Sequence, residues 1–478
     1  MRENENDGLM LAAPRVVPPL DPAFRPAALA VRALEAEALS SARPVFAELA
    51  LEQPDGAVFR LRTALLPAEH GHAAGNLRHL ERLVKFALWA RGGCRLYLDA
   101  PPGLAERLAA HYADTATGRF DADVVGERIY DRPLEVLATH DLPPERSTTM
   151  PLGCHLEGCR IGFDLGGSDR KAAAVKDGQV IWSDETEWDP YHQHDPRYHF
   201  DGIMDSLRKA ALHLPRIDAI GGSAAGVYVH NRVRFASLFR GVSPEVFDRQ
   251  VRDMLLEIRH AWRDVPFEVV NDGAVTALAG SMALGTGAVL GLALGTSTAS
   301  GFVTADGGIT SSLDELAFAP IDYRPDAPRD EWSGDLGCGV QYLSQQAVGR
   351  LLAPAGIEVD PALPLPRKLK HVQALMAAGD DRARHIYETL GVYLGYALMH
   401  YASFYDFHHV LLLGRVTTGP GGDVIIDRAR EALRADAADL AARITFHMPD
   451  ETARRHGQAV AAASLPLATA PPALPTGS

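Results

Sequence analysis

The sequence predicts an α/β protein in which two related lobes follow a smaller N-terminal α/β domain. From Cys159 onward, short apolar strands broken by glycine turns alternate with helical segments, a pattern typical of α/β architecture. A search for internal repeats aligns residues 162–181 with residues 291–310 without a gap. Each segment predicts a strand, a tight Gly-Ser/Thr turn, a second strand, an Asp-Gly hairpin turn and a third strand. We therefore infer two similar lobes, lobe I at residues 154–284 and lobe II at residues 285–449.

Both ends of the chain are expected to lie outside the folded domains. Residues 1–27 are charged and then rich in proline, and residues 466–478 are rich in proline and alanine. Such segments lack the apolar periodicity of helices and strands. We therefore expect a disordered or extended segment at residues 1–27 and a flexible tail at residues 466–478.

The N-terminal α/β module and a linker occupy residues 28–153. An amphipathic helix is predicted at residues 76–91, ending at the Gly92-Gly93 pair, and a second helix follows later in the module. Alternating patterns predict strands at 45–52, 57–66 and 94–100. Nothing in this module indicates a chemistry. Residues 141–153 are rich in Pro, Ser and Thr, so they are expected to form the linker to the lobes.

The composition excludes several classes of function. The chain of 478 residues has 47 Lys and Arg against 61 Asp and Glu, a formal net charge of −14, which disfavours binding to nucleic acid or anionic lipid. It contains no uninterrupted apolar run of the roughly 18 residues that a membrane span needs. Four cysteines are too few for a disulfide scaffold, and the start of the chain lacks the pattern of a secretory signal. We expect a cytoplasmic protein without nucleic-acid or membrane partners.

The repeated glycine-rich turns have the composition of an anion-binding site. Glycine lets backbone N–H groups approach an anion closely, and a neighbouring Ser or Thr adds a hydroxyl donor. One such turn is typical of an ordinary β-hairpin, whereas two equivalent turns, one in each lobe, would grip a polyphosphate from both sides of a cleft. The candidate residues are Gly166, Gly167 and Ser168 in lobe I and Gly295, Thr296 and Ser297 in lobe II.

Only the first of the two turns has a carboxylate beside it. Asp164 in lobe I corresponds to Ala293 in lobe II. Because Mg²⁺ prefers one or two carboxylates together with water and phosphate oxygens, Asp164 is the candidate metal residue. Lys171 follows the same turn and would either neutralise phosphate charge or be an ordinary solvated strand residue; the sequence favours neither.

A further candidate follows a predicted strand that ends at Asn271-Asp272-Gly273 and leads into a helix. Ligands of open α/β sheets collect beyond the carboxyl ends of the strands, which places Asp272 where chemistry occurs. An Asp at the start of a helix is also a common N-cap. From spacing alone, the catalytic and the capping interpretation of Asp272 are evenly balanced.

At this point the chain resembles a known family. The segments DLGGSDRKAAAV, GGSAAGVYVHNRVRFASLF, VVNDGAVTAL, LALGTSTASGFV and HVLLLGRVTTGPGG, in this order, resemble the ROK (repressor/ORF/kinase) sugar kinases of the actin/Hsp70/hexokinase superfold. The similarity covers about residues 160–464. It implies a two-lobed, actin-like (ribonuclease H-like) ATPase fold in which a helix at residues 450–465 completes lobe I. It also suggests a homodimer.

The resemblance implies a function and a role for each motif residue. The activity would be ATP-dependent phosphorylation of a hydroxyl of a sugar, amino sugar or cyclitol-like molecule. Asp272 would be the general base, and Asp164 would order Mg²⁺ through water. The resemblance implies substrate contacts at Asn271, Glu315 and Ser237, and Gln341 is a further candidate substrate contact because it adjoins the altered motif. The resemblance also implies nucleotide contacts at Gly166, Gly167, Ser168, Lys171, Gly295, Thr296, Ser297, Gly414, Gly421 and Gly422, with Gly419 in the same loop.

The chain also departs from the family pattern. ROK kinases usually carry an acidic-x-Gly-His motif and a cysteine cluster that binds zinc; here Glu315 matches the acidic residue, but Phe318 replaces the histidine and Cys338 is the one cysteine left. Zinc is therefore not an expected cofactor. Val340 stands where an acidic sugar contact is usual, and Asp335 or Gln341 could substitute. A metal site that combines Cys338 with Cys154, His155 and Cys159 is conceivable, but packed thiols are the favoured interpretation.

Two alternative functions remain open. One is a ROK-like sugar-sensing regulator; those proteins carry an N-terminal helix-turn-helix, and the acidic, strand-containing module found here is a poor reader of DNA. The other is a catalytically weak nucleotide-binding interaction protein, suggested by the altered sugar motif. The phosphate-binding and base residues are all kept, which favours the kinase.

Overall fold

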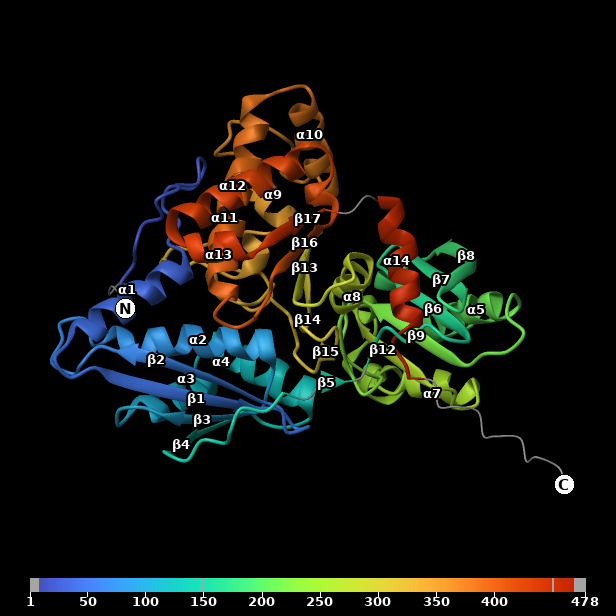
Figure 1. The fold of residues 1–478 in the computed structure, drawn as a ribbon, viewed down its shortest axis with the longest axis horizontal. Helices are drawn as coiled ribbons and strands as arrows, with labels where there is room; N and C mark the ends of the chain where they lie inside the picture. The colour runs from blue at the N-terminus through green and yellow to red at the C-terminus, as the bar shows by residue number, and fades with distance from the viewer. Residues whose placement is uncertain (1–7, 148, 151, 449–450, 468–478) are drawn as a thin grey trace. The chain divides into compact units, whose positions relative to one another are not determined.

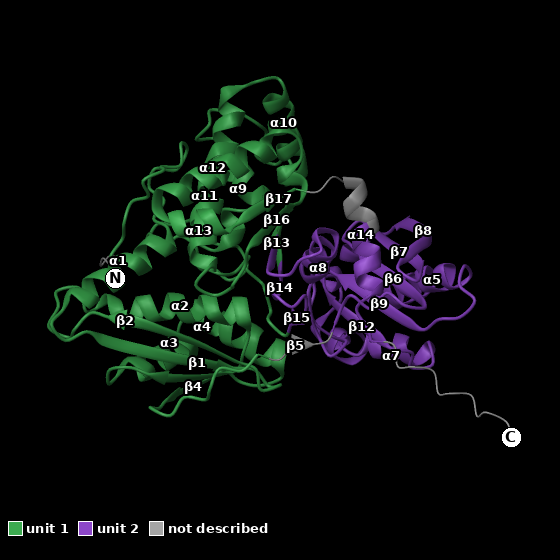
Figure 2. Cartoon of the chain, viewed as in Figure 1, with its two compact units in different colours: residues 1–148, 292–300, 311–448 green, residues 149–291, 301–310, 449–478 purple. Residues whose placement is uncertain are grey.

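The computed structural model describes residues 8–147, 149–150, 152–448 and 451–467. The chain divides into two compact units, coloured separately in Figure 2. Unit 1 comprises residues 1–148, 292–300 and 311–448, and unit 2 comprises residues 149–291, 301–310 and 449–478. Strands β13 (Val289–Leu294) and β14 (Thr298–Val303) are divided between the two units. Both units combine helices with β-strands (Figure 1), so the predicted α/β class is confirmed.

The N-terminal module of unit 1 has a sheet of its own. Its strand order is β2-β1-β3-β4; β1 runs antiparallel to β2 and β3, and β3 runs parallel to β4. The predicted strands and helices of the module are confirmed. The elements are α1 (Ala27–Ser40), β1 (Val45–Glu52), β2 (Val58–Leu65), α2 (Gly75–Arg91), β3 (Arg95–Asp99), α3 (Leu104–Asp114), α4 (Ala116–Asp121), the π-helix η1 (Ala122–Ile129) and β4 (Glu135–Ala138).

Helix α2 departs from the amphipathic pattern expected of it. Its apolar residues are buried, but Glu81, Arg82 and Lys85 are buried as well, each at 2% exposure or less. A charged residue is rarely fully buried unless it is paired. The charges of α2 must therefore be neutralised inside unit 1.

The segment before α1 is extended and packed rather than disordered over its described part. Phe24 is fully buried, and its ring contacts those of Tyr342, Tyr393 and Tyr396. The buried carboxylate of Asp21 accepts hydrogen bonds from Arg324, at 2.7 Å, and from the hydroxyl of Tyr393, at 2.5 Å. Residues 1–7 and 468–478, which include most of the expected tail, lie outside the described residues.

The remainder of unit 1 is mainly helical. Helix α11 lies close along α12 because Gly391 and Gly395 have no side chain; a Cβ at these positions would meet the carbonyl oxygens of Ile425 and Ala429 at 2.6 and 2.8 Å. Strands β16 and β17 are parallel. The elements are η5 (Gly339–Gln341), α9 (Gln345–Leu351), α10 (Leu365–Ala377), α11 (Asp381–Tyr401), β16 (His409–Leu413), η6 (Arg415–Thr417), α12 (Pro420–Asp436), α13 (Ala438–Arg443) and β17 (Thr445–His447).

Unit 2 is built on a five-stranded mixed sheet of order β12-β9-β6-β7-β8. Strands β6, β9 and β12 are parallel, whereas β7 and β8 extend the sheet as antiparallel hairpins, as expected of a ribonuclease H-like fold. The elements are β5 (Thr149–Met150), β6 (Cys159–Leu165), β7 (Asp169–Lys176), β8 (Gln179–Glu187), η2 (Pro190–His192), α5 (Arg197–Ala211), β9 (Ala219–Ala224), β10 (Val227–Val229), β11 (Arg232–Phe235), η3 (Ser237–Phe239), α6 (Pro244–Val246), η4 (Phe247–Val251), α7 (Met254–Ala261), β12 (Phe267–Asn271), α8 (Asp272–Leu284), β15 (Ile309–Thr310) and α14 (Glu451–Ala463).

Helix α14 packs on β6 and β9 of this sheet. Two glycines permit the close approach: a Cβ at Gly162 would meet the carbonyl oxygen of Ala459 at 2.2 Å, and one at Gly221 would meet that of Ala462 at 1.8 Å. The last helix of the chain therefore covers the strands that carry the candidate site residues. Among the described residues, every helix is too short or too polar to cross a membrane.

The internal repeat is confirmed as a local structure. Each copy folds as strand, turn, strand, turn and strand, namely β6-β7-β8 and β13-β14-β15. The Asp177-Gly178 turn has φ angles of 49° and 77°, and Gly307 has a φ of 85°, values that favour the predicted Asp-Gly hairpin turns. The third strands differ in length, because β8 has 9 residues and β15 has 2.

Candidate active site

Three parallel strands of unit 2 bring polar residues to one edge of the sheet. Asp164, near the end of β6, is in register with Ser223 on β9, and the Ser223 hydroxyl donates a hydrogen bond of 2.7 Å to the Asp164 carboxylate. Asn271, at the end of β12, is in register with Ala224 of β9. Because carboxyl ends of parallel strands meet at a common edge, Asp164 and Asp272 share one neighbourhood.

Asn271, and not Asp272, caps the helix that follows. The Asn271 side-chain oxygen accepts a hydrogen bond from the Gly273 N–H at 2.7 Å, and its amide nitrogen donates to the carbonyl of Gly226 at 2.8 Å. Asp272 is the first residue of α8, and its carboxylate also accepts from Gly273, at 3.0 Å. The capping interpretation of Asp272 is therefore wrong. The implied contact of Asn271 with substrate stays a prediction.

The electrostatic surroundings make Asp272 a weaker acid than an ordinary aspartate. Burial raises its pKa to about 6, and repulsion from Asp164 adds to the effect. Burial also raises the pKa of Asp164, although Lys171 and Ser223 oppose the shift. A carboxylate with a pKa near the working pH is suited to accept a proton, because it is ionised yet still basic.

Lys171 is directed at carboxylates rather than at solvent. It is in register with Asp164 across the β6–β7 hairpin, and its ammonium lies 3.7 Å from Asp164 and 2.9 Å from Asp169. Burial lowers the pKa of Lys171, but the two carboxylates outweigh this and raise it. The lysine is thus a positive charge held beside Asp164, and its contact with phosphate stays a prediction.

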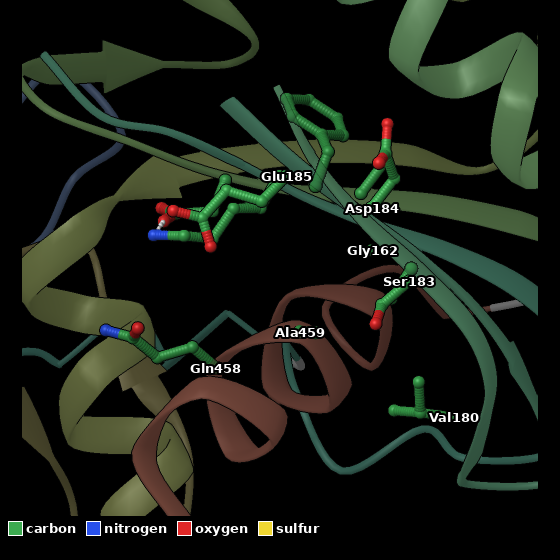
Figure 3. Close-up of a pocket in the computed structure, with 12 residues that line it drawn as sticks. Gly162, Val180, Ser183, Asp184, Glu185, Gln458 and Ala459 are labelled. Atoms are coloured by element: carbon green, nitrogen blue, oxygen red, sulfur yellow. Dashed lines mark ion pairs between the residues drawn. The ribbon is translucent and has the colours of Figure 1, made fainter. Parts of the chain in front are cut away.

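A pocket of about 320 Å³ in unit 2 contains Asp164 and Lys171 (Figure 3). Figure 3 shows Glu185 on the sheet side of the pocket and Gln458 on α14. Sequence reasoning did not identify these two residues. The Asp-Gly turn alone would not have identified Glu185, because a β-bulge at Ala174–Val175 shifts the register of β8 on β7 by one residue and places Glu185 opposite Lys171. Gln458 comes from a helix almost 300 residues later, and no local pattern indicates it.

The glycines of the lobe I turn have structural reasons of their own. The Gly166 N–H donates to the carbonyl of Asp169 at 3.0 Å, which closes the β6–β7 turn, and the indole N–H of Trp188 donates to the Gly166 carbonyl at 2.8 Å. A Cβ at Gly167 would meet the Tyr191 hydroxyl at 2.0 Å. The Ser168 hydroxyl donates to Asp169 at 3.0 Å. The phosphate contacts of this turn stay a prediction.

Within unit 1, the structure brings two of the predicted nucleotide turns together. Gly414 has a φ of 95°, and a Cβ there would meet the Leu294 carbonyl at 2.4 Å, so Gly414 packs directly beside the turn at residues 295–297. The Gly295 N–H donates to Ser297 at 2.9 Å. At the start of α12, a Cβ would meet the Tyr387 ring from Gly421 and the Thr417 carbonyl from Gly422, so both glycines also serve close packing.

The residues predicted to bind the substrate that accepts the phosphate lie in different parts of the chain. Ser237 begins the short helix η3 of unit 2, whereas Glu315 and Gln341 belong to unit 1. The Gln341 amide donates to the side chain of Gln346 at 2.6 Å. Asp335 is 3% exposed and is paired with Arg82 at 2.7 Å, so the interpretation of Asp335 as a substitute sugar contact is wrong.

The residues around Asp164 fit a magnesium ion that is bound through water. Asp164 supplies a partly exposed carboxylate beside a hydroxyl, which suits Mg²⁺ bound through water. Within the described ranges, no group of three or more His, Cys, Asp or Glu residues could hold a metal ion. Cys159 is buried at the start of β6, Cys154 is exposed, and Cys338 is buried in unit 1 beside Ser333.

Comparisons with known proteins give structural neighbours alone. No protein-family model matches the chain, and no curated protein matches it. A ROK hexokinase from Thermus thermophilus is 19% identical and covers 64% of this chain and 97% of its own, with a TM-score of 0.48. A ROK family glucokinase from Streptomyces griseus, solved with glucose and AMPPNP, is 20% identical, covers 63% and 98%, and has a TM-score of 0.48. A ROK family transcriptional regulator, a homologue of the E. coli MLC protein, is 16% identical, covers 80% and 96%, and has a TM-score of 0.48.

Proposed function

We propose that this chain is a kinase that transfers the γ-phosphate of ATP to a hydroxyl of a sugar, amino sugar or cyclitol-like molecule. The observation that carries the proposal is the Asp272 carboxyl, which stands at the end of β12 close enough to Asp164 for their charges to interact, with its pKa raised to about 6. A structural carboxylate is usually paired with a cation or protected by several donors. Asp272 accepts hydrogen bonds from backbone N–H groups at the start of its own helix, but its main charged neighbour is Asp164, which repels it and keeps its pKa raised.

In the proposed reaction, Asp272 accepts the proton of the acceptor hydroxyl. The hydroxyl oxygen forms a bond to the γ-phosphorus, the bond from that phosphorus to the β-phosphate oxygen breaks, and ADP leaves with the electron pair. Phosphoryl transfer depends mainly on positioning and charge neutralisation, so one correctly placed base and a few phosphate donors suffice.

The charges around Asp164 supply the neutralisation. When bound, Mg²⁺ would offset the negative charge of the transferring phosphate, and Asp164 would hold it through water. Lys171 is already held beside this carboxylate and can turn from Asp169 to a phosphate oxygen. The backbone N–H groups of Gly167 and Ser168 would bind further phosphate oxygens.

Unit 1 supplies the other proposed contacts. Thr296 and Ser297 would bind phosphate oxygens, and Gly414 would line the adenosine side. The close packing of Gly414 on Leu294 supports this assignment, because it places the two turns side by side. Glu315 and Gln341 would contact the acceptor.

The proposal is tested by ADP release in the presence of MgATP and a panel of sugars, amino sugars and cyclitols. Asp272→Asn should lower kcat on the accepted substrate by about 10²–10⁴-fold, the usual contribution of a general base. The matched control is Asp177→Asn, in the β7–β8 turn, where an Asn keeps the positive φ of 49° and should leave kcat unchanged. Equal kcat in Asp272→Asn and wild type would remove Asp272 from the reaction. Sugar binding without ADP release would favour a regulator or an interaction protein.

A further inference from the structure

The C-terminal end of helix α2 is capped by Asp314 and Glu315, the first residues of the segment at 314–335. The last four carbonyls of an α-helix have no partner within the helix. In α2, the carbonyls of Trp89 and Ala90 accept hydrogen bonds from the backbone N–H groups of Glu315, at 2.9 Å, and Asp314, at 3.0 Å. The backbone around Glu315 is thus attached to the N-terminal module.

A buried ionic cluster attaches the other end of this segment, at Asp335, to helix α2. Asp335 lies 2.7 Å from the guanidinium of Arg82 and 3.1 Å from the ammonium of Lys85. Lys85 also donates to both carboxylate oxygens of Asp121, at 2.8 and 2.9 Å. The side chains of Arg82, Lys85, Asp121 and Asp335 are each 4% exposed or less. Removing one partner from such a cluster leaves an uncompensated buried charge, so the cluster holds its members tightly.

Trp89 links the ionic cluster to Phe318. Its indole N–H donates to Asp121 at 2.8 Å, and its ring stacks on that of Phe318 with centroids 4.3 Å apart. Lys85 binds the same aspartate, so helix α2 joins Phe318 at one end of the segment to Asp335 at the other. The segment is therefore held at three points, which are its backbone at residues 314–315, the ring of Phe318 and the carboxylate of Asp335.

The cations and carboxylates of the cluster neutralise one another, which suits a structural role rather than a catalytic one. Burial raises the pKa of Asp335, but Arg82 and Lys85 outweigh it and hold the pKa well below the ordinary value. Lys85 is likewise more basic than usual, because Asp121 and Asp335 outweigh its burial. Asp335 and Lys85 therefore stay charged near neutral pH, whereas burial raises the pKa of Asp121 although Lys85 and Trp89 oppose the shift.

We propose that helix α2 is the support of the acceptor-binding segment and that Lys85 is its central positioning residue. The N-terminal module is then an integral part of the acceptor site, and acceptor specificity depends on it. This inference rests on the proposed function, since it takes Glu315 as an acceptor contact.

The kinetic test compares Lys85→Met with Lys85→Arg. Lys85→Met should raise the acceptor KM by about tenfold, as expected for loss of an interaction that positions the acceptor, while the ATP KM changes by less than about twofold. Lys85→Arg keeps a cation between the two aspartates and should restore part of the loss. The control is Arg60→Gln, which breaks a pair with Glu48 in the same module, where both side chains are about one-third exposed. An unchanged acceptor KM in folded Lys85→Met, or equal changes in both KM values, would overturn the proposal.

A second variant covers the case in which Lys85→Met does not fold. Trp89→Phe keeps a ring against Phe318 but removes the N–H that binds Asp121, and it should raise the acceptor KM in the same direction. Hydrogen exchange at the amides of Asp314 and Glu315 provides a readout that needs no turnover, and both amides should exchange faster in Trp89→Phe. Unchanged exchange there would refute the support role. If the wild-type chain releases no ADP with any acceptor, the proposed function fails, and the exchange rates still decide whether α2 holds the segment.

Discussion

Two groups of carboxylates, one fully buried and one partly buried, have charges that are balanced differently. In unit 1, each buried carboxylate of the α2 cluster has a cationic nitrogen within 2.8 Å; the pairs are Glu81–Arg82, Asp335–Arg82 and Asp121–Lys85. In unit 2, Lys171 is shared between Asp164 and Asp169, and the main charge acting on Asp272 is the repulsion of Asp164.

The difference shows in the acidities. The pKa of Asp335 falls because its cations outweigh its burial. The pKa of Asp164 rises because burial outweighs Lys171, and the pKa of Asp272 rises through burial and repulsion from Asp164. Burial alone thus does not distinguish a structural carboxylate from a reactive one. The balance of nearby charges matters as well: two cations hold the pKa of Asp335 low, one lysine leaves the pKa of Asp121 raised, and Asp272 has a repelling carboxylate as its main charged neighbour.

The largest expected effect follows from removing one charge in each group. Asp335→Asn leaves Arg82 and Lys85 with too little negative charge in a buried site, so the free energy of unfolding should fall by about 3–5 kcal/mol. Asp272→Asn removes a charge that has no neutralising partner, so it should change that free energy by less than about 1 kcal/mol, or raise it. Urea unfolding at pH 7 measures both. A larger loss in Asp272→Asn than in Asp335→Asn would break the comparison.

A smaller effect comes from two buried histidines of unit 1. Burial lowers the pKa of His79 to about 4 and that of His400 to about 3. In the unfolded chain these histidines take up a proton at a pKa of about 6.5, whereas in the folded chain they stay neutral to lower pH. Their burial is therefore without penalty above about pH 6.5, and the folded state loses stability as the pH falls toward about 4. Each histidine should cost about 2 kcal/mol at pH 5 relative to pH 7. Asp272 acts in the opposite sense, since its raised pKa favours the folded state in acid.

The double variant His79→Gln/His400→Gln tests this pH dependence. Its free energy of unfolding should fall less between pH 7 and pH 5 than that of the wild type. His260→Gln is the control, because the side chain of His260 is 85% exposed. If wild type and the double variant lose stability in parallel, the two histidines are not the cause.

Local signals explain what the sequence predicted. The strand, turn and helix around Asp164 and Asp272 are set by residues close to them in the chain, and the parallel strands then bring the two carboxylates to one edge. The repeat at residues 291–310 was found for the same reason. The capping role of Asn271 was missed, because Asn and Asp are equally good caps and adjacent candidates cannot be separated by pattern.

Contacts between distant parts of the chain explain what the sequence did not predict. Arg82 and Asp335 are 253 residues apart, and the charged residues of α2 fit the polar face of an ordinary surface helix. Asp335 was therefore taken for a free sugar contact. The packing of Asp21 against Arg324, across 303 residues, likewise could not be predicted from a proline-rich segment without periodicity.

The pH dependence of ADP release tests the central claim most directly. Asp272 must be ionised to accept a proton, so kcat/KM for the acceptor should be constant above about pH 7 and fall about tenfold per unit below a midpoint near pH 6. In Asp272→Asn, the residual rate should lose this acid limb. A profile that stays flat down to pH 5, or an acid limb that persists unchanged in Asp272→Asn, would contradict the assignment of Asp272 as the base.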